Sequence, residues 1–204
     1  MRVVVCNTED IEHCSVKKEM FAARRSVFID LLKWKLPVFD SRYEVDQFDD
    51  SHARYVIIMK DGERHAASTR LLPTTRPHIL SVLFPDLCNE PLPQGPTVLE
   101  ITRFCLDRYQ HRSERRAARN LLITALVDYA LRETIITYTG VAEVNWFRQF
   151  SQFGWSCRAL GKPKSCGPKA LIPFRIDIDD QTANRMIATG IYSTKPHRLS
   201  GRAV

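Results

Sequence analysis

Two charged residues lie in a strongly apolar stretch of the sequence. Residues 97–106 are mostly β-branched, aromatic or aliphatic and follow the Pro-Gln-Gly-Pro segment 93–96, which predicts a central, largely buried strand. This strand carries Glu100 and Arg103. Buried charges are costly unless they are paired, hydrogen-bonded or facing a ligand, so the two serve either an ion-pair network or a site. Side chains alternate along a strand, so the two point to opposite faces, and we predict a β-bulge that re-aims one of them.

Further polar and aromatic residues could contribute to the same chemistry. The first expected helix and its exit carry Arg24, Phe28 and Trp34, while Asp46 and Asp49 lie in the segment that follows. Arg70 ends an expected strand. Each residue also has an ordinary structural role open to it: the aromatic rings in the core, the aspartates as solvated carboxylates, and Arg70 in a strand-end salt bridge. The residue types alone leave both roles open.

Composition limits the class of protein. The 204 residues are 44% hydrophobic and 26% charged, which is typical of a globular chain with one core. No apolar run approaches the roughly 20 residues of a membrane span, and the N-terminus lacks a signal-peptide pattern, so we expect a cytoplasmic protein. The six cysteines show no metal-binding or redox spacing, which predicts reduced thiols and no metal. The net charge of +7 indicates an acidic partner: nucleic acid, phosphate groups or an acidic protein.

Strands and helices alternate along the chain. The patterns predict strands at 2–6, 53–60, 64–72, 97–106, 134–141, 155–160 and 170–178. Helices are expected from residue 7 or 8 to about 33, within 77–87, from about 113 to 130, at 143–153 and at 179–189. Residues 34–50 form an unpatterned loop, and Asp61-Gly62 predicts a hairpin. We therefore predict a single three-layer α/β domain over residues 1–192, with a mixed, mostly antiparallel sheet and a basic, flexible tail at 193–204.

Taken in order, the polar and aromatic residues resemble a known family. The motifs are Arg24-x3-Phe28-x5-Trp34, Glu44-x-Asp46-x2-Asp49, Arg70-Leu-Leu-Pro-Thr74 and Glu100-x2-Arg103-Phe104. They resemble the acyl-homoserine-lactone synthases, the LuxI-type autoinducer synthases of bacterial quorum sensing, from about residue 20 to 106 and more weakly to Gly154-Trp155. The resemblance implies a fold similar to that of the N-acetyltransferases.

The resemblance also implies substrates. The family joins S-adenosylmethionine, a cosubstrate rather than a permanently bound cofactor, to an acyl group carried as a thioester on acyl carrier protein or coenzyme A. Phe28 and Trp34 would then contact the sulfonium and the adenine, and Phe104 would belong to the same substrate-binding set. Asp46 would bind the amino group and Arg103 the carboxylate.

The remaining motif residues receive structural and catalytic roles. Arg24, Asp49 and Arg70 would form an ion-pair cluster that fixes the loop over the site. Glu100 is the candidate base that takes a proton from the attacking amine, directly or through a water. Backbone N–H groups near residues 103–106 would stabilise the oxyanion. Arg103 is thus expected to act beside Glu100 in catalysis.

A basic segment follows the central strand where N-acetyltransferases place a glycine-rich pyrophosphate loop, but this segment contains no glycine. We predict that it binds the carrier protein or the phosphopantetheine arm, with a solvated basic helix start as the alternative. Its candidate residues are Arg112, Arg115, Arg116 and Arg119, and Lys162, Lys164 and Lys169 could extend the surface.

The acyl chain is expected between the strand at 134–141 and the next helix. The candidate lining residues are Tyr138, Thr139, Trp146 and Phe150. If the two bulky aromatic residues line the pocket, they favour a short, branched or aromatic acyl group. The alternative is that they are ordinary core residues.

Two other functions remain open on the residues alone. A coenzyme A-dependent N-acyltransferase acting on another amine would keep the thioester chemistry but would leave the aromatic and acidic residues at 34–49 without a cationic cosubstrate. A basic nucleic-acid-binding module would fit the charge, yet the sequence contains no recognition motif for one. We therefore expect no nucleic-acid partner.

Overall fold

The described residues form two compact units. The computed structural model describes residues 1–10, 14–36, 41–167, 169–194 and 199–200. Unit 1 comprises Met1–Leu71, Arg103–Ala125 and the described part of Lys195–Val204, and unit 2 comprises Leu72–Thr102 and Leu126–Thr194. Each unit is therefore assembled from segments that are far apart in the sequence.

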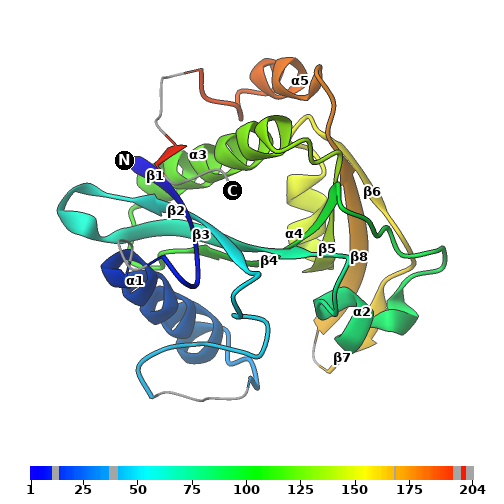
Figure 1. The fold of residues 1–204 in the computed structure, drawn as a ribbon, viewed down its shortest axis with the longest axis horizontal. Coiled ribbons are helices and arrows are strands. Elements are labelled where there is room, and N and C mark those ends of the chain that lie inside the picture. The colour runs from blue at the N-terminus through cyan, green and yellow to red at the C-terminus, as the bar shows by residue number, and fades with distance from the viewer. Residues whose placement is uncertain (11–13, 37–40, 168, 195–198, 201–204) are drawn as a thin grey trace. The chain divides into compact units, whose positions relative to one another are not determined.

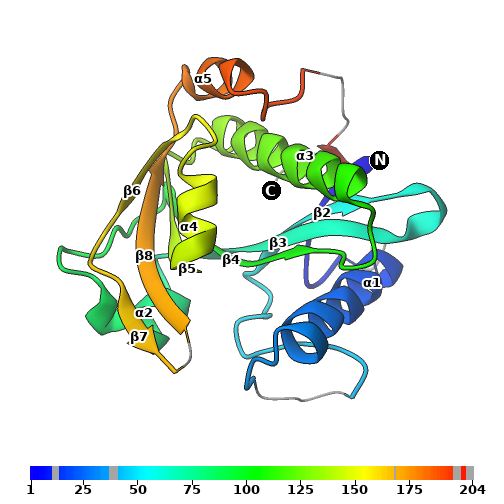
Figure 2. The ribbon, with the colours of Figure 1, turned by 180° about the vertical axis from the view of Figure 1, so that it is seen from behind.

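Unit 1 is built on an antiparallel set of strands. β1 (Arg2–Asn7) pairs with β2 (Arg54–Met59), which pairs with β3 (His65–Pro73). β9 (Leu199–Ser200) adds to β1 in parallel. Helix α1 (Cys14–Arg24) and the first part of α3 (Arg112–Arg132) lie on opposite faces of β1–β3 (Figures 1 and 2). Apolar side chains bury both faces, and Val3, Val4, Val56 and Ile57 are fully enclosed.

The first helix differs from its predicted form in two ways. The described helix runs from Cys14, and residues 8–10 are turn and coil, whereas the pattern predicted a start at residue 7 or 8. After Arg24 the helix continues as the π-helix η2 (Arg25–Leu31). Single π-helical turns often lie at functional sites, and this one carries Phe28.

Unit 2 has a mixed set of strands. β4 (Val98–Leu106) begins in this unit and pairs in parallel with β5 (Thr137–Glu143). β5 pairs antiparallel with β8 (Lys169–Asp177), which also pairs with β6 (Ser156–Ala159) and β7 (Lys164–Cys166). Helix α4 (Val144–Phe150) packs against β5 and β8. The unit also contains α2 (Ile79–Leu83), the short 3-10 helix η4 (Pro85–Leu87) and α5 (Thr182–Ala188).

The order of predicted elements is confirmed, with local differences. The hairpin contains the 3-10 helix η3 (Asp61–Glu63) in place of a two-residue turn, and Glu63 adopts φ = 59° there. Sequence patterns did not predict the short strands β7 and β9. The described residues of the predicted loop, 34–36 and 41–50, contain neither helix nor strand. Residues 37–40 of that loop, and 195–198 and 201–204 of the predicted tail, lie outside the described residues.

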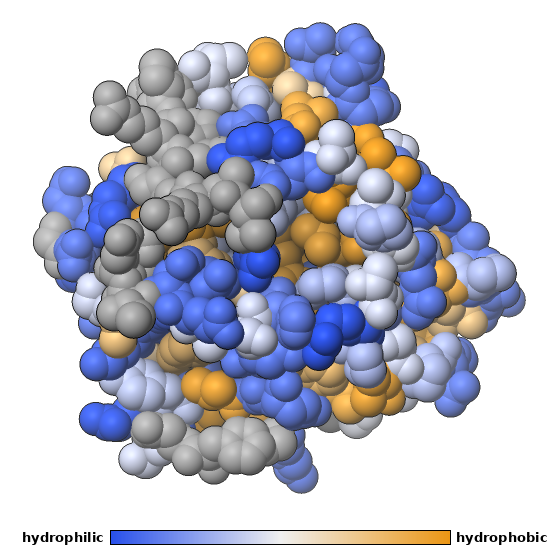
Figure 3. All heavy atoms as spheres, in the orientation of Figure 1, coloured by the Kyte–Doolittle hydropathy of each residue, from blue (hydrophilic) through white to orange (hydrophobic). Residues whose placement is uncertain are grey.

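One face of the molecule is drawn by residue hydropathy in Figure 3. Figure 3 shows blue, hydrophilic residues over most of one face, with separate orange patches among them. In the part of the chain that the structure describes, no helix combines the length and the apolar character needed to cross a membrane.

The end of α3 contains a strained residue that allows a test of the fold. Ile135 donates its N–H to the Ala130 carbonyl at 2.8 Å, so Thr134 occupies the left-handed position after the helix, with φ = 54°. A β-branched residue is unfavourable there, whereas glycine is not. We expect Thr134→Gly to raise the free energy of unfolding by about 0.5–1 kcal/mol in urea titrations. Thr134→Val keeps the branch and should bring no gain; equal stability of all three proteins would contradict the argument.

Candidate active site

Six buried charged side chains meet in unit 1. Three are arginines from separate elements: Arg24 ends α1, Arg70 lies on β3 and Arg103 lies on β4. Three are carboxylates from one loop, and these are Glu44, Asp46 and Asp49. None of the six side chains is more than 10% exposed. Three positive and three negative charges balance, which is the condition for enclosing so many ions together.

The six charges form a closed ring in which cations and anions alternate. Arg24 contacts Glu44 at 2.5 Å and Asp49 at 2.8 Å. Arg70 contacts Asp49 at 2.8 Å and Asp46 at 2.6 Å. Arg103 closes the ring, with its Nη2 2.6 Å from Asp46 and its Nε 3.0 Å from Glu44. We call this arrangement the charge ring.

The charge ring explains how residues 44–49 are held without helix or strand. Asp49 accepts the N–H of Asp46 at 2.9 Å, and Asp46 accepts the N–H of Phe48 at 2.8 Å. Glu44 donates its own N–H to the Phe21 carbonyl at 3.1 Å, and the Tyr55 hydroxyl donates to Asp49 at 3.0 Å. The carboxylates thus fix both the arginines and their own backbone.

The electrostatic balance differs around the charge ring. Burial alone would raise the pKa of Asp49, but Arg24 and Arg70 outweigh burial and hold that pKa well below its ordinary value. The pKa of Asp46 is likewise lowered, because Arg70 and Arg103 overcome its desolvation. Burial lowers the pKa of Arg103, and repulsion from Arg70 and Arg24 adds to this against the attraction of Glu44 and Asp46. The pKa values of Arg24 and Arg70 are raised by their carboxylate partners despite burial, so Arg103 differs from them in direction.

Arg103 also has an unusual backbone. Its φ of 52° is left-handed, which is strained for a residue with a side chain and typical of one position in a β-bulge. This irregularity lies where the sequence predicted a bulge. It allows the Arg103 side chain to enter the charge ring from β4.

The predicted aromatic pair adjoins the charge ring. Phe28 and Trp34 stack with centroids 4.7 Å apart and planes at 19°, and the guanidinium carbon of Arg103 lies 5.8 Å from the Phe28 centroid. Phe28 is buried with Val27 and Cys105, whereas Trp34 is half-buried. Phe104 is also half-buried, on β4. Three expected neighbours, Phe28, Trp34 and Arg103, therefore meet.

Glu100 belongs to unit 2 and has backbone partners that the sequence did not indicate. Its side chain is fully buried and accepts the N–H groups of Ile79 and Leu80 at 2.8 and 2.7 Å. These amides begin helix α2, so the carboxylate orients the helix start and is itself held in a fixed direction. The expected role of Glu100 as a base remains a prediction.

The predicted acyl-pocket residues lie in a tightly packed part of unit 2. Tyr138 donates its hydroxyl to the Leu126 carbonyl at 2.9 Å, and Thr139 donates to the Phe174 carbonyl at 3.0 Å. The ring centroid of Phe150 lies 4.7 Å from that of Phe174 and 5.8 Å from that of Trp146. Of the four predicted lining residues, Trp146 alone is half-buried rather than buried.

The four predicted carrier-surface arginines differ in availability. Arg115 turns back to donate to the Asp107 carbonyl at 3.0 Å, and Arg119 donates to the Asn120 side chain at 2.9 Å. Arg112 and Arg116 are exposed, and neither makes a hydrogen bond or ion pair with any described residue. The structure therefore divides this set into two bonded and two outward-facing side chains.

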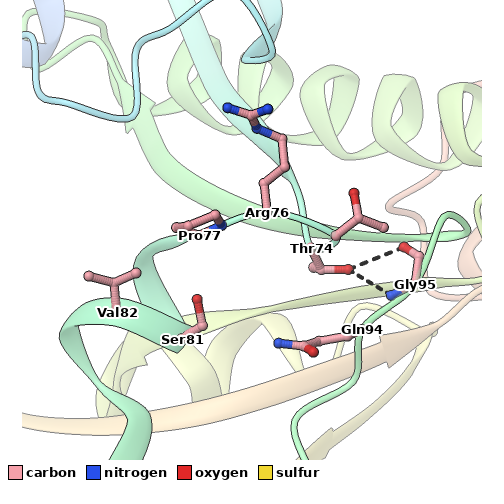
Figure 4. Close-up of a pocket in the computed structure, with 8 residues that line it drawn as sticks. Thr74, Arg76, Pro77, Ser81, Val82, Gln94 and Gly95 are labelled. Carbon is pink, nitrogen blue, oxygen red and sulfur yellow. Dashed lines mark hydrogen bonds between the residues drawn. The ribbon is translucent and has the colours of Figure 1, made fainter.

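Unit 2 also has an open cavity of about 620 Å³ beside α2. Thr74 closes one side, because its hydroxyl bonds to both the N–H and the carbonyl of Gly95, while Ser81 and Gln94 also face the cavity (Figure 4). Thr74 belongs to one of the sequence motifs, but no residue to which the sequence analysis gave a role in the site is among the residues that line this cavity.

The sequence assigned no role to Glu44, a member of the charge ring, or to Tyr55 beside it. Glu44 was part of the motif, and its spacing from Asp46 and Asp49 was the available signal. Tyr55 lies on β2 and gave no signal, because a tyrosine in a buried strand is usual in a core.

The charge ring predicts how unit 1 responds to loss of one anion. Asp49→Asn leaves Arg24 and Arg70 without their shared charge, so we expect the free energy of unfolding at pH 7 to fall by about 3–5 kcal/mol. The ionised Asp49 stabilises the fold above its unfolded pKa of about 3.9, and this stabilisation is lost as the pH falls toward its lowered folded pKa. The difference between wild type and variant should therefore shrink at acid pH. Asp30→Asn, an exposed control on η2, should change stability by less than about 0.5 kcal/mol; equal effects of the two variants would contradict the prediction.

Comparison with known proteins identifies the family. Residues 7–186 match the family model for autoinducer synthases. The acyl-homoserine-lactone synthase of Ralstonia nicotianae is 31% identical over 166 residues, which are 78% of this chain and 80% of that protein. TofI, solved in a ternary complex with an inhibitor and MTA, is 28% identical, with a TM-score of 0.77 over 92% of this chain and 97% of its own.

The fold has wider likenesses. BjaI, a CoA-dependent acyl-homoserine lactone synthase solved with SAM and isopentyl-CoA, is 22% identical, with a TM-score of 0.88 over 100% of this chain and 95% of its own. An acyl-CoA N-acyltransferase from Pseudomonas aeruginosa is 13% identical, with a TM-score of 0.58 over 86% and 99%. The predicted likeness to N-acetyltransferases is therefore confirmed for the fold. With a family model matching residues 7–186, the chain belongs to the autoinducer synthase family.

Proposed function

We propose that this chain makes an acyl-homoserine lactone from S-adenosylmethionine and an acyl thioester, with the site residues acting as follows. The observation that carries the proposal is the state of Arg103. Its Nε and Nη2 are held in the charge ring, while its Nη1 makes no hydrogen bond to any described residue. A guanidinium that is fixed in position and still has N–H groups without a partner suits a substrate carboxylate.

The aromatic pair suits the rest of the cosubstrate. Phe28 and Trp34 stack beside Arg103, so a zwitterion bound at Arg103 would bring its cationic end toward aromatic faces. Asp46 adjoins Arg103 and is the candidate partner of the amino group. Arg24, Asp49, Arg70 and Glu44 keep these groups in place without contacting the substrate.

The reaction needs two bond exchanges. In the first, the amine nitrogen attacks the thioester carbonyl, a C–N bond forms, and the C–S bond breaks to release the thiol. Glu100 accepts the amine proton, which then passes to the departing sulfur, and N–H groups near residues 103–106 stabilise the oxyanion. In the second exchange, the carboxylate oxygen attacks the carbon next to the sulfonium, so the lactone closes and methylthioadenosine leaves. Holding both groups in one molecule favours this closure.

The acyl donor is a thioester of coenzyme A or of acyl carrier protein. Solved relatives contain SAM with isopentyl-CoA in one case and MTA in another, and we extend the use of S-adenosylmethionine and an acyl thioester to this chain. We propose that Tyr138, Thr139, Trp146 and Phe150 border the acyl group. Trp146, the half-buried residue of the four, would limit the length of the acyl chain that can bind.

Product analysis tests the assignment. Purified protein given S-adenosylmethionine with coenzyme A and carrier-protein thioesters of different length should form an acyl-homoserine lactone and methylthioadenosine, both detected by mass spectrometry. Omitting S-adenosylmethionine should abolish acylation, whereas acylation of another amine would favour a general N-acyltransferase. Glu100→Gln should lower kcat at least about 100-fold, because the amine loses its base. Glu90→Gln removes an exposed carboxylate of the same unit and should leave kcat unchanged; unchanged lactone output from Glu100→Gln would reject the catalytic role.

The acyl border is tested by chain-length preference. Trp146→Ala removes the half-buried ring, so kcat/KM for long over short straight-chain thioesters should rise about tenfold. Arg148→Ala removes an exposed side chain from the same helix and should leave the ratio unchanged. An unchanged ratio for the Trp146 variant would assign that ring to packing alone.

A further inference from the structure

Helix α2 is too short to hold its own first turn. It has five residues, and a helix of that length is unstable unless contacts from outside the helix fix it. Two of its amides, those of Ile79 and Leu80, are nevertheless the partners of the Glu100 carboxylate, at 2.8 and 2.7 Å. The direction of this carboxylate therefore depends on the groups that fix the start of α2.

The residue before the helix, His78, fixes this start with its side chain. Its imidazole is fully buried, and Nδ1 lies 2.8 Å from the Arg76 carbonyl. A carbonyl can only accept a hydrogen bond, so Nδ1 carries the proton and donates it. Burial lowers the pKa of His78, so the ring is neutral at pH 7 and Nε2 has no proton. Nε2 makes no hydrogen bond with any residue that the structure describes, so the polar contacts of the ring are on its Nδ1 side.

Ser81, labelled in Figure 4, completes the arrangement from within α2. Its hydroxyl accepts the N–H of His78 at 3.1 Å, donates to the His78 carbonyl at 3.0 Å and lies 3.2 Å from Nδ1 of the same residue. Reciprocal contacts of this kind close the first turn of a helix. The backbone and the imidazole of His78 are thereby both tied to the turn whose amides hold Glu100.

We propose that His78 and Ser81 are positioning residues for Glu100: they hold the first turn of α2 so that its amides keep the carboxylate directed at the attacking amine. This inference rests on the proposed role of Glu100 as the base, and it adds the residues on which that role depends. Neither residue needs to contact a substrate. Misplacing a catalytic group by about 1 Å can cost about 100-fold in rate, so loss of these contacts should act on kcat.

Substitutions of His78 separate its two nitrogens. The side-chain N–H groups of asparagine can occupy the place of Nδ1 and donate to the Arg76 carbonyl, whereas those of glutamine reach the place of Nε2. We expect His78→Ala and His78→Gln to lower kcat at least about tenfold, with KM for S-adenosylmethionine changed less than about twofold, and His78→Asn to retain most of the activity. Hydrogen exchange of the Ile79 and Leu80 amides should be faster in the first two variants and close to wild type in the third.

A double-mutant cycle tests whether the effect passes through Glu100. In the Glu100→Gln protein, His78→Ala should lower kcat by less than about twofold further, because the base that it positions is already lost. Ser81→Ala should lower kcat of the otherwise wild-type protein at least about fivefold. The matched control is Thr182→Val at the start of α5, because the Thr182 hydroxyl accepts the N–H of Asp179 at 3.0 Å as Ser81 accepts that of His78. This control should leave kcat unchanged.

Several results would overturn the proposal. These are an unchanged kcat in His78→Ala, an equal effect of that substitution with and without Glu100, equal losses in the asparagine and glutamine variants, or unchanged exchange at the two amides. Equal losses in Ser81→Ala and Thr182→Val would also do so, because they would then follow from weaker folding of the unit. Failure of the proposed function gives a different result, since wild type would form no lactone with any thioester or Glu100→Gln would keep full activity. In either case hydrogen exchange still decides whether His78 holds the turn.

Discussion

A balanced set of buried charges constrains the structure of unit 1. Arg24, Arg70 and Arg103 cannot be enclosed without anions, and the three carboxylates cannot be enclosed without the arginines. The charge ring satisfies every member by placing it between two ions of opposite sign. Such an arrangement adds little net stability compared with an apolar core. It does fix the orientation of the side chains, because a guanidinium donates hydrogen bonds only in the plane of its N–H groups.

The rest of the site follows from this constraint. The loop that carries Glu44 and Asp49 needs no helix or strand, since the carboxylates hold its backbone as well as the arginines. Arg103 reaches the charge ring through a left-handed backbone and donates to it from Nε and Nη2. Phe28, which stacks on Trp34, lies beside the Arg103 guanidinium. The Arg103 guanidinium is thus fixed in place by the carboxylates of the charge ring.

The sequence predicted much of this, for identifiable reasons. Alternating hydrophobic patterns indicated the strands, and a charged pair on an apolar strand indicated the irregularity at Arg103. The π-helix at Arg25–Leu31 could not be predicted, because a helical pattern of apolar residues does not distinguish the i→i+5 hydrogen bonds of a π-helix from those of an α-helix. The bonds from Ile79 and Leu80 to Glu100 were also beyond prediction, since backbone donors leave no trace in residue identity. Local sequence patterns predict helices and strands, whereas hydrogen bonds between residues far apart in the chain depend on the tertiary structure.

The distribution of the ring's members along the chain has a consequence for how the protein acquires its shape. The anions lie close together in one loop, but the cations come from elements far apart, and Arg103 is 59 positions from Glu44. Contacts across such separations carry a large chain-closure cost, so they form after local helices and hairpins. On a nascent chain the loop carboxylates emerge well before their last cation. The site must therefore be completed late, when β4 has left the ribosome and can supply Arg103.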